Sequence, residues 1–187
     1  MPSRTHICNL ALSEIGQPPI TDIADVTTNA KRCNLMFDDI ADEVSASKYW
    51  SKLKNRVELA LVSEDPVYEF NFQFQLPADH LEIISINDNP EETVVYQIEK
   101  SRLLINDSSV FIKYIQKQSN PEKWGQLLER VVVLRLAAGL CYITTGDKTL
   151  TDSLYLRYET YSRKYSSLDS NQGSRRKMKA RTITRVR

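Results

Sequence analysis

The stretch from Trp124 to Thr145 constrains the fold most, because it is the longest apolar segment in a chain of 187 residues. Its apolar residues recur with helical spacing, at positions 124, 127, 128, 131, 134, 138 and 141. Further apolar residues occupy the rest of the helical circle, and a helix that is apolar on nearly all sides is buried on nearly all sides. Three charged residues interrupt the segment, so we expect a buried central helix between Pro121 and Gly146 rather than a membrane span.

A second helix is predicted from about Thr149 to Leu168. One apolar face runs along it, formed by Leu150, Leu154, Tyr158, Tyr161, Tyr165 and Leu168. The short connection at 146–148 predicts that this helix runs antiparallel to the central one. The predicted core of the two helices comprises Trp124, Leu127, Val131, Leu134, Ala138, Leu154, Tyr158, Tyr161 and Tyr165. The central helix has more apolar surface than one partner covers, so N-terminal helices are expected to cover the rest.

Two helices are predicted near the N-terminus. The first covers residues 5–15 and ends at Gly16, and the second is capped by Thr27 or Thr28. The second carries an apolar stripe of Ala30, Cys33, Phe37, Ile40 and Val44. Its opposite face is acidic, with Asp38, Asp39, Asp42 and Glu43. These acids could bind a metal or act as an acid/base pair, but no histidine or EF-hand spacing accompanies them, which favours a solvated face or a subunit contact.

The middle of the chain is predicted to form a small sheet. Residues 67–75 alternate strictly between apolar and polar, which is typical of a half-buried strand. Their aromatic row could stack nucleic-acid bases, but no Lys or Arg lies between the aromatics, so a sheet core is favoured. Further strands are expected at 81–86, 94–98, 103–105 and 110–115, joined as antiparallel hairpins by short turns. Residues 56–62 fit either a strand or the end of a helix.

The predicted fold class is therefore α+β, an antiparallel helical bundle with an inserted antiparallel β domain. We divide the chain into the N-terminal half of the bundle (1–50), the inserted β domain (51–116), the C-terminal half of the bundle (117–169) and an extended basic C-terminal arm (170–187). The arm contains seven basic residues and no acid: Arg175, Arg176, Lys177, Lys179, Arg181, Arg185 and Arg187. The rest of the chain has 18 basic residues against 24 acidic ones, a net charge of −6.

The cysteines predict a reducing compartment of synthesis. Cys8, Cys33 and Cys141 are far apart in the sequence and form no CxxC pair, so no disulfide framework is expected. Free cysteine on an apolar helical face acts as a small hydrophobe. The N-terminal residues lack the long apolar core and cleavage site of a secretory signal.

The residue types of an active site are sparse. The sequence has two histidines, His6 and His80, in different regions, and it contains no GxSxG, Walker or HExxH motif. We therefore expect no enzymatic activity, no catalytic residue, no metal site and no cofactor.

Several stretches, in order, resemble the tail tubular protein A family, the head-to-tail adaptors of short-tailed bacteriophages. The segment Asn9–Ile23 resembles the opening helix and turn of the family, and a second helix ends in Tyr49-Trp50. Phe74–Ile83 resembles a Tyr-x-Leu-Pro-x-Asp motif at the start of a strand, through Leu76, Pro77 and Asp79. Val110–Gln116 is similar to the last strand before the helix, and Leu134–Thr144 to a Leu-Ala-Ala helix. Phe74, Lys52-Leu53 and Cys141 depart from the family pattern.

The resemblance implies a structural virion protein at the head-tail junction, made in the host cytoplasm. Such adaptors form a ring, a dodecamer in this family, between the portal protein and the tail nozzle or tail tube protein. Genomic DNA passes through the channel without sequence-specific binding, and no membrane is involved. The basic arm would then dock on the portal or on a neighbouring copy. The acidic body suits a channel wall, because like charge disfavours phosphate contacts.

Two alternative functions come from other classes. A nucleic-acid-binding accessory protein would use the arm at 170–187, and its affinity would fall steeply with salt. An envelope-degrading enzyme would need two carboxylates at a suitable separation, and the sequence nominates no such pair. The sequence leaves open which residues face the channel and which apolar residues pack across subunits.

Overall fold

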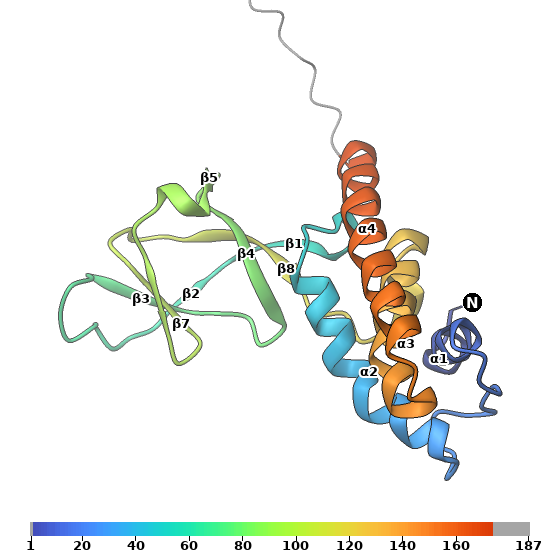
Figure 1. Ribbon diagram of the computed structural model, residues 1–187. Coiled ribbons are helices and arrows are strands. Elements are labelled where there is room, and N and C mark those ends of the chain that lie inside the picture. Colours follow the sequence, from blue (N-terminus) through green and yellow to red (C-terminus); the bar gives the residue numbers. More distant parts are fainter. Residues whose placement is uncertain (1, 174–187) are drawn as a thin grey trace, which may run out of the picture.

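The computed structural model describes residues 2–173, and this part of the chain is an α+β protein with four α-helices and two four-stranded antiparallel sheets (Figure 1). The helices are α1 (Arg4–Glu14), α2 (Thr28–Ala46), α3 (Gln126–Thr145) and α4 (Lys148–Gly173). The strands lie between α2 and α3: β1 (Lys54–Glu58), β2 (Ala60–Leu61), β3 (Phe72–Gln75), β4 (His80–Ile86), β5 (Asn89–Pro90), β6 (Gln97–Glu99), β7 (Arg102–Ile105) and β8 (Phe111–Gln116). The predicted α+β class is confirmed.

Each of the two N-terminal helices is preceded by a capping residue with a hydroxyl side chain. The Ser3 hydroxyl accepts a hydrogen bond from the backbone N–H of His6 at 3.1 Å, and the Thr27 hydroxyl accepts one from Ala30 at 3.3 Å. All five residues of the predicted α2 stripe are buried, from Ala30 to Val44. Both predicted helices are confirmed, and the predicted cap of the second is Thr27; the Ser3 cap of the first was not predicted.

The central helix α3 begins at Gln126, two residues later than predicted. Gly125 has a φ of 84°, outside the helical region, and a short 3₁₀ helix at Pro121–Lys123 precedes it. Trp124 is therefore not part of α3, although it is buried and stacks on Phe37 with ring centroids 5.9 Å apart. Its indole N–H donates to the carbonyl of Gln118 at 2.6 Å. The sequence pattern assigned Trp124 to the helix because a buried residue just before a helix can fall at the same spacing as the buried residues within it.

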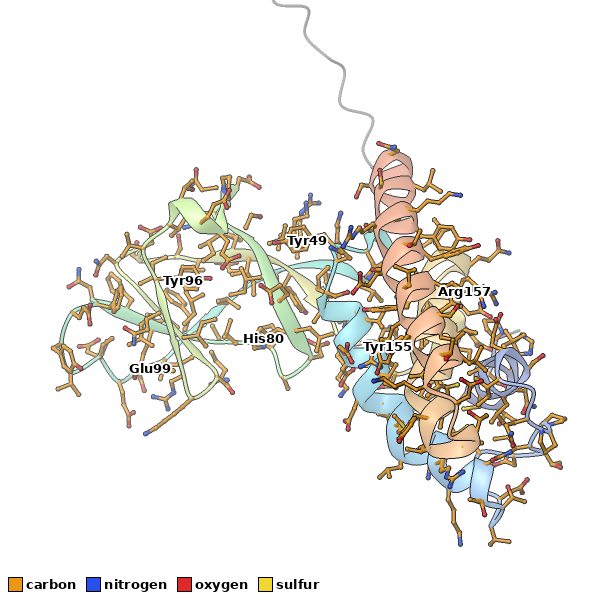
Figure 2. All side chains as sticks on the ribbon, viewed as in Figure 1. Tyr49, His80, Tyr96, Glu99, Tyr155 and Arg157 are labelled. Atoms are coloured by element: carbon orange, nitrogen blue, oxygen red, sulfur yellow. The ribbon has the colours of Figure 1, made fainter. Side chains whose placement is uncertain are left out.

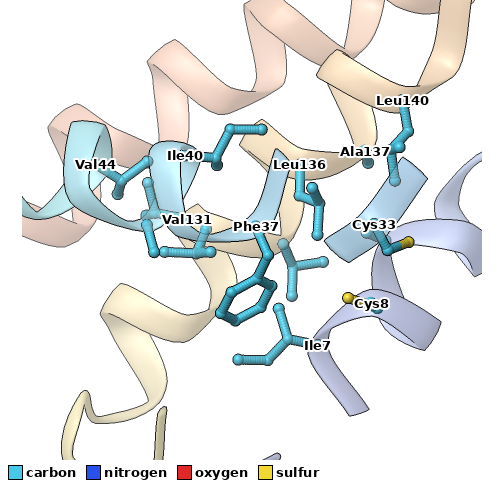
Figure 3. Close-up of a cluster of buried hydrophobic side chains, with 14 of the residues drawn as sticks. Ile7, Cys8, Cys33, Phe37, Ile40, Val44, Val131, Leu136, Ala137 and Leu140 are labelled. Atoms are coloured by element: carbon cyan, nitrogen blue, oxygen red, sulfur yellow. The ribbon is translucent and has the colours of Figure 1, made fainter. Parts of the chain in front are cut away.

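Helices α1, α2 and α4 all contact α3, which explains its apolar circumference (Figure 1). Ten of its residues are buried: Leu128, Val131, Val132, Val133, Leu134, Leu136, Ala137, Ala138, Leu140 and Cys141. Figure 3 shows Leu136 beside Phe37 and Cys33 of α2. The last turn differs, because its apolar residues Tyr142 and Ile143 are exposed.

The two sheets enclose a second apolar core. Their strand orders are β1-β8-β4-β5 and β2-β3-β7-β6, which we call sheet A and sheet B. The segment left open at 56–62 forms β1 in sheet A and β2 in sheet B, with buried Leu59 between them. The enclosed core includes Phe74, Ile86 and Leu103. Because β1 pairs with β8, the first and last strands of this segment lie together beside the helices.

The predicted strand at 67–75 is wrong for residues 67–71. Only Phe72–Gln75 is a strand, while Glu69 has a φ of 75° and Tyr68 is 77% exposed. A positive φ interrupts the pleat, so the side-chain alternation does not describe one surface. Gln73 is buried along with Phe74, and its side-chain amide donates to the carbonyl of Glu64 at 2.6 Å.

The strand predicted at 94–98 begins three residues later in the structure. Residues Glu91–Thr93 form a 3₁₀ turn, and the strand is Gln97–Glu99. The hairpin at Lys100-Ser101 is as predicted, and both of its turn residues have positive φ. The hairpin predicted between the strands at 103–105 and 110–115 is wrong, because β7 belongs to sheet B and β8 to sheet A. Within residues 2–173, no helix is long and apolar enough to cross a membrane.

Candidate interaction surfaces

The acidic face of α2 is tied to three other parts of the protein. Asp38 forms an ion pair with Arg4 of α1, and Asp42 pairs with Lys117, which follows β8. Glu43 receives two hydrogen bonds from Arg135 of α3, at 3.0 and 2.9 Å. Burial works against the charge of Arg135, but the hydrogen bonds with Glu43 raise its pKa overall. These contacts give the acidic face a structural role.

The guanidinium of Arg135 also lies over two aromatic rings of α4. It is 5.2 Å from the ring centroid of Tyr155 and 5.9 Å from that of Tyr158 (Figure 2 labels Tyr155). One arginine therefore connects α3 with both α2 and α4.

Glu14 at the end of α1 accepts hydrogen bonds from two arginines. Arg130 of α3 donates to one carboxylate oxygen at 2.7 Å, and Arg157 of α4 donates to the other at 2.9 Å. Burial alone would raise the pKa of Glu14, but these two arginines lower it overall. The Glu14 carboxylate thus joins three helices at their shared surface.

Asp169 anchors the C-terminal end of α4 to the junction between helices and sheets. It is 8% exposed, and its carboxylate accepts hydrogen bonds from the backbone N–H of Ser51 at 2.6 Å and the Ser51 hydroxyl at 2.7 Å. Leu168, the last residue of the predicted apolar face of α4, is 42% exposed, and its neighbour Asp169 is buried instead.

The motifs that carry the family resemblance have structural roles in this chain. Both side-chain groups of Asn9 bond the backbone of Ile20, at 2.9 and 2.8 Å, which closes the loop after α1. The carboxylate of Asp79 accepts hydrogen bonds from Tyr114 at 3.3 Å and Gln116 at 2.6 Å, both on β8. The indole of Trp50 donates to the carbonyl of Val44 at 3.0 Å. These residues fix loops and strand ends.

The predicted core residues gather around α3. Trp124, Val131, Leu134, Ala138 and Leu154 are buried. Leu127, Tyr158 and Tyr165 are half-buried against the helical core, and Tyr161 meets Tyr165 edge-on at 5.1 Å. The seven basic residues proposed for the arm, Arg175 to Arg187, lie outside the described residues.

Cys8 and Cys33 come together although they are far apart in the sequence. Both are completely buried, and Figure 3 shows their side chains in the core between α1 and α2. A hydrogen bond to Cys33, together with burial, raises the pKa of the Cys8 thiol. Cys8, Cys33 and Cys141 are all free thiols. Sequence spacing could not show that α1 and α2 cross at Cys8 and Cys33.

The described residues bring together no cluster of three or more metal-ligating side chains. His6 lies on α1 and His80 on β4, where its ring nitrogen lies 3.2 Å from the carbonyl of Pro77 (Figure 2). A cavity of about 280 Å³ lies under the loop at 64–70, where Arg102 bonds Gln73 at 3.2 Å. On that loop, Val67 is 96% exposed. Nothing in this cavity resembles a nucleophile with a positioned base.

Comparisons with known proteins add no relative: no protein-family model matches the chain, and no curated protein matches it.

Proposed function

We propose that this protein is a structural virion component, a head-to-tail adaptor that assembles as a ring between a portal protein and the tail nozzle. In this proposal each copy contributes an antiparallel helical bundle with an inserted β domain. The predicted arm at 170–187 begins inside α4, so its basic part, Arg175 to Arg187, is the segment that docks on the portal or on the next copy. The copy number, a dodecamer, comes from the resemblance. The genome passes through the channel, and the protein has no catalytic role.

The observation that carries the proposal is the order of elements around α3. Two helices precede the strands and two follow them, and pairing of β1 with β8 brings the two ends of the strand segment together beside the helices. This order matches the sequence of motifs in the tail tubular protein A resemblance. The motif residues Asn9, Trp50 and Asp79 stabilise the loops and strand ends of that architecture.

The negative net charge outside the arm also supports a channel through which DNA passes rather than a DNA-binding surface. Residues 1–169 carry a net charge of −6. A channel wall of the same sign as DNA disfavours phosphate contacts that would slow the genome. The basic residues are concentrated in the arm, which in this proposal contacts protein.

The test is reconstitution with purified portal rings. The full-length protein should add a ring of density to one end of the portal in low-resolution images, and removal of residues 170–187 should abolish this addition. A matched variant with the seven basic residues replaced by glutamine keeps the length and removes the charge. If the full-length protein never associates with portal, the proposal is wrong. If deletion of the arm removes only salt-sensitive DNA affinity, the nucleic-acid-binding alternative is correct.

A further inference from the structure

One line of residues crosses sheet A from edge to edge. The strand register places Arg56 of β1 opposite Lys113 of β8, Lys113 opposite Ser85 of β4, and Ser85 opposite Pro90 of β5. Directly paired residues point to the same face of an antiparallel sheet. This face is turned away from the core shared with sheet B, because the alternate residues Val57, Ile112 and Ile86 pack into that core.

The β1 edge of this face carries three basic residues and one acid, Glu58, which lies two residues beyond Arg56 on β1. Lys54 and Arg56 are two residues apart on one strand, so they share the face, and Lys113 lies directly opposite Arg56. Like charges in directly opposed positions destabilise a sheet. Burial lowers the pKa of Lys54, and the positive charge of Lys113 lowers it further, although Asp169 acts in the opposite direction. We call Lys54, Arg56 and Lys113 the basic patch.

The basic patch borders a depression in the surface. The depression has a volume of about 590 Å³, and Arg56, Lys113 and Phe111 line it together with the acids Glu58 and Asp88. Phe111 is 52% exposed, which is unusual for an aromatic residue on a strand. An apolar side chain beside unpaired charge is typical of a surface that a partner covers.

The opposite edge of sheet A is acidic. Glu82 lies on β4, and Glu91 and Glu92 directly follow β5. The 3₁₀ turn at Glu91–Thr93 contacts β4, which brings these acids to one end of the sheet. Burial raises the pKa of Tyr49, which is exposed, and the negative charges of the three glutamates raise it further (Figure 2 labels Tyr49). We call Glu82, Glu91 and Glu92 the acidic patch.

Neither patch is neutralised within residues 2–173. None of their six charged side chains lies within 4.0 Å of an oppositely charged group there, whereas Asp38, Asp42 and Glu43 of α2 all have cationic partners. Sheet A thus carries a net positive charge at its β1 edge, where Lys54, Arg56 and Lys113 outnumber Glu58, and a negative charge at its opposite edge. The two patches are complementary to each other but are on opposite edges of one sheet, so one copy cannot join them.

We propose that sheet A is a head-to-tail interface, in which the basic patch of one copy contacts the acidic patch of the next. A contact between two different patches is heterologous, and repetition of it closes a ring when the rotation per copy divides a full turn. This inference rests on the proposed ring, and it names the surface that joins neighbouring copies. Phe111 is then covered by the adjacent copy.

The experiment reverses each patch in the full-length protein. The basic-patch variant is Arg56→Glu/Lys113→Glu, and the acidic-patch variant is Glu91→Lys/Glu92→Lys. The matched controls reverse exposed charges elsewhere, Lys31→Glu/Lys164→Glu and Asp65→Lys/Glu99→Lys. Self-association is measured by sedimentation at low salt for the protein alone and by occupancy of portal rings.

Each patch variant alone should associate about a hundredfold more weakly than its control, because like charges then oppose each other across the interface. An equimolar mixture of the two patch variants should regain assembly, because the glutamates introduced in one variant then face the lysines introduced in the other. The variant that carries all four substitutions should regain it as well. Unchanged association of both patch variants, or no rescue in the mixture, would overturn the inference.

The outcomes separate this inference from the proposed function. If wild-type rings form on portal and the patch variants assemble as well as their controls do, the adaptor function stands and the interface is wrong. If the protein self-associates through the patches but never binds portal, the interface stands and the adaptor function fails. If Arg56→Glu/Lys113→Glu loses affinity for a labelled DNA duplex with self-association unchanged, the basic patch binds phosphate and the inference is overturned.

Discussion

Leu136 provides the most direct test of the packing around α3. Its side chain is completely buried, and it lies beside Phe37 and Cys33 where α1, α2 and α3 meet (Figure 3). Leu136→Ala removes buried methyl groups and leaves a cavity, which should lower the free energy of unfolding by about 2–5 kcal/mol. Leu136→Asp should prevent folding or assembly altogether, because an unpaired buried charge costs several kcal/mol.

The loss is large enough to measure by thermal unfolding. A chain of this size changes its melting temperature by about 2–4 °C per kcal/mol, so a loss near 3 kcal/mol lowers it by about 6–12 °C. The matched control is Leu156→Ala on α4, where the leucine is 67% exposed and the expected change is within about 0.5 kcal/mol. Circular dichroism at 222 nm follows the transition. Equal melting temperatures for Leu136→Ala and Leu156→Ala, or a folded and soluble Leu136→Asp variant, would refute the burial of this face.

Three further predictions concern polar and thiol groups. Asp169→Asn should destabilise the protein by about 1–3 kcal/mol in urea titrations, because it weakens two hydrogen bonds to Ser51, whereas exposed Asp152→Asn should have no comparable effect. The lowered pKa of Glu14 means that its contribution is complete above its unfolded-state pKa of about 4.3 and is lost as pH falls through the lower folded-state value. Glu14→Gln should therefore reduce the loss of stability on acidification, and an unchanged pH profile would contradict this. Cys8 and Cys33 should react with a thiol reagent only on unfolding, because both are buried and the pKa of Cys8 is raised, so rapid labelling of the native protein would count against the packing of α1 on α2.

The helices could be predicted from the sequence because their signals are local. Thr27 lies beside the backbone group that it caps, and the stripe from Ala30 to Val44 repeats at a spacing that only a helix makes continuous. The C-terminal end of α3 was predicted from Gly146, which follows its last residue. Its start was missed because Gly125 changes the backbone direction without interrupting the apolar pattern.

The strands were harder to predict because pairing and backbone conformation override alternation. The aromatic row at 67–75 alternates over its whole length, but the positive φ of Glu69 excludes its first half from the sheet. Side-chain alternation does not reveal a positive φ. The residue type gives no warning either, because a positive φ is uncommon for glutamate. The register of sheet A, which brings Arg56 opposite Lys113, depends on the pairing of segments far apart in the sequence and is not visible in either segment alone.

The polar contacts of the candidate surfaces could not be predicted for the same reason. Glu14 binds arginines 116 and 143 positions away, and Asp169 binds a serine 118 positions away. Each of these charges looks like ordinary surface charge in the sequence. The absence of histidine and of calcium-loop spacing around the acids of α2 favoured a solvated face or a subunit contact. Their ion pairs within the chain were not predicted, because they depend on the packing of α2 against its neighbours.

The contacts at the junction between helices and sheets bear on whether sheet A can act as a fixed interface. Ile115 of β8 packs in the helical core, Lys117 just beyond it pairs with Asp42 of α2, and Asp169 of α4 bonds Ser51 just before β1. Three contacts that differ in position and in chemistry restrict rotation of the sheet about its two connecting segments. A heterologous interface closes a ring only when the rotation between neighbours divides a full turn, and otherwise it produces an open filament. The junction therefore supplies the rigidity that a heterologous interface on sheet A requires, and loss of the Asp169 contact should broaden the distribution of assembled species before it abolishes assembly.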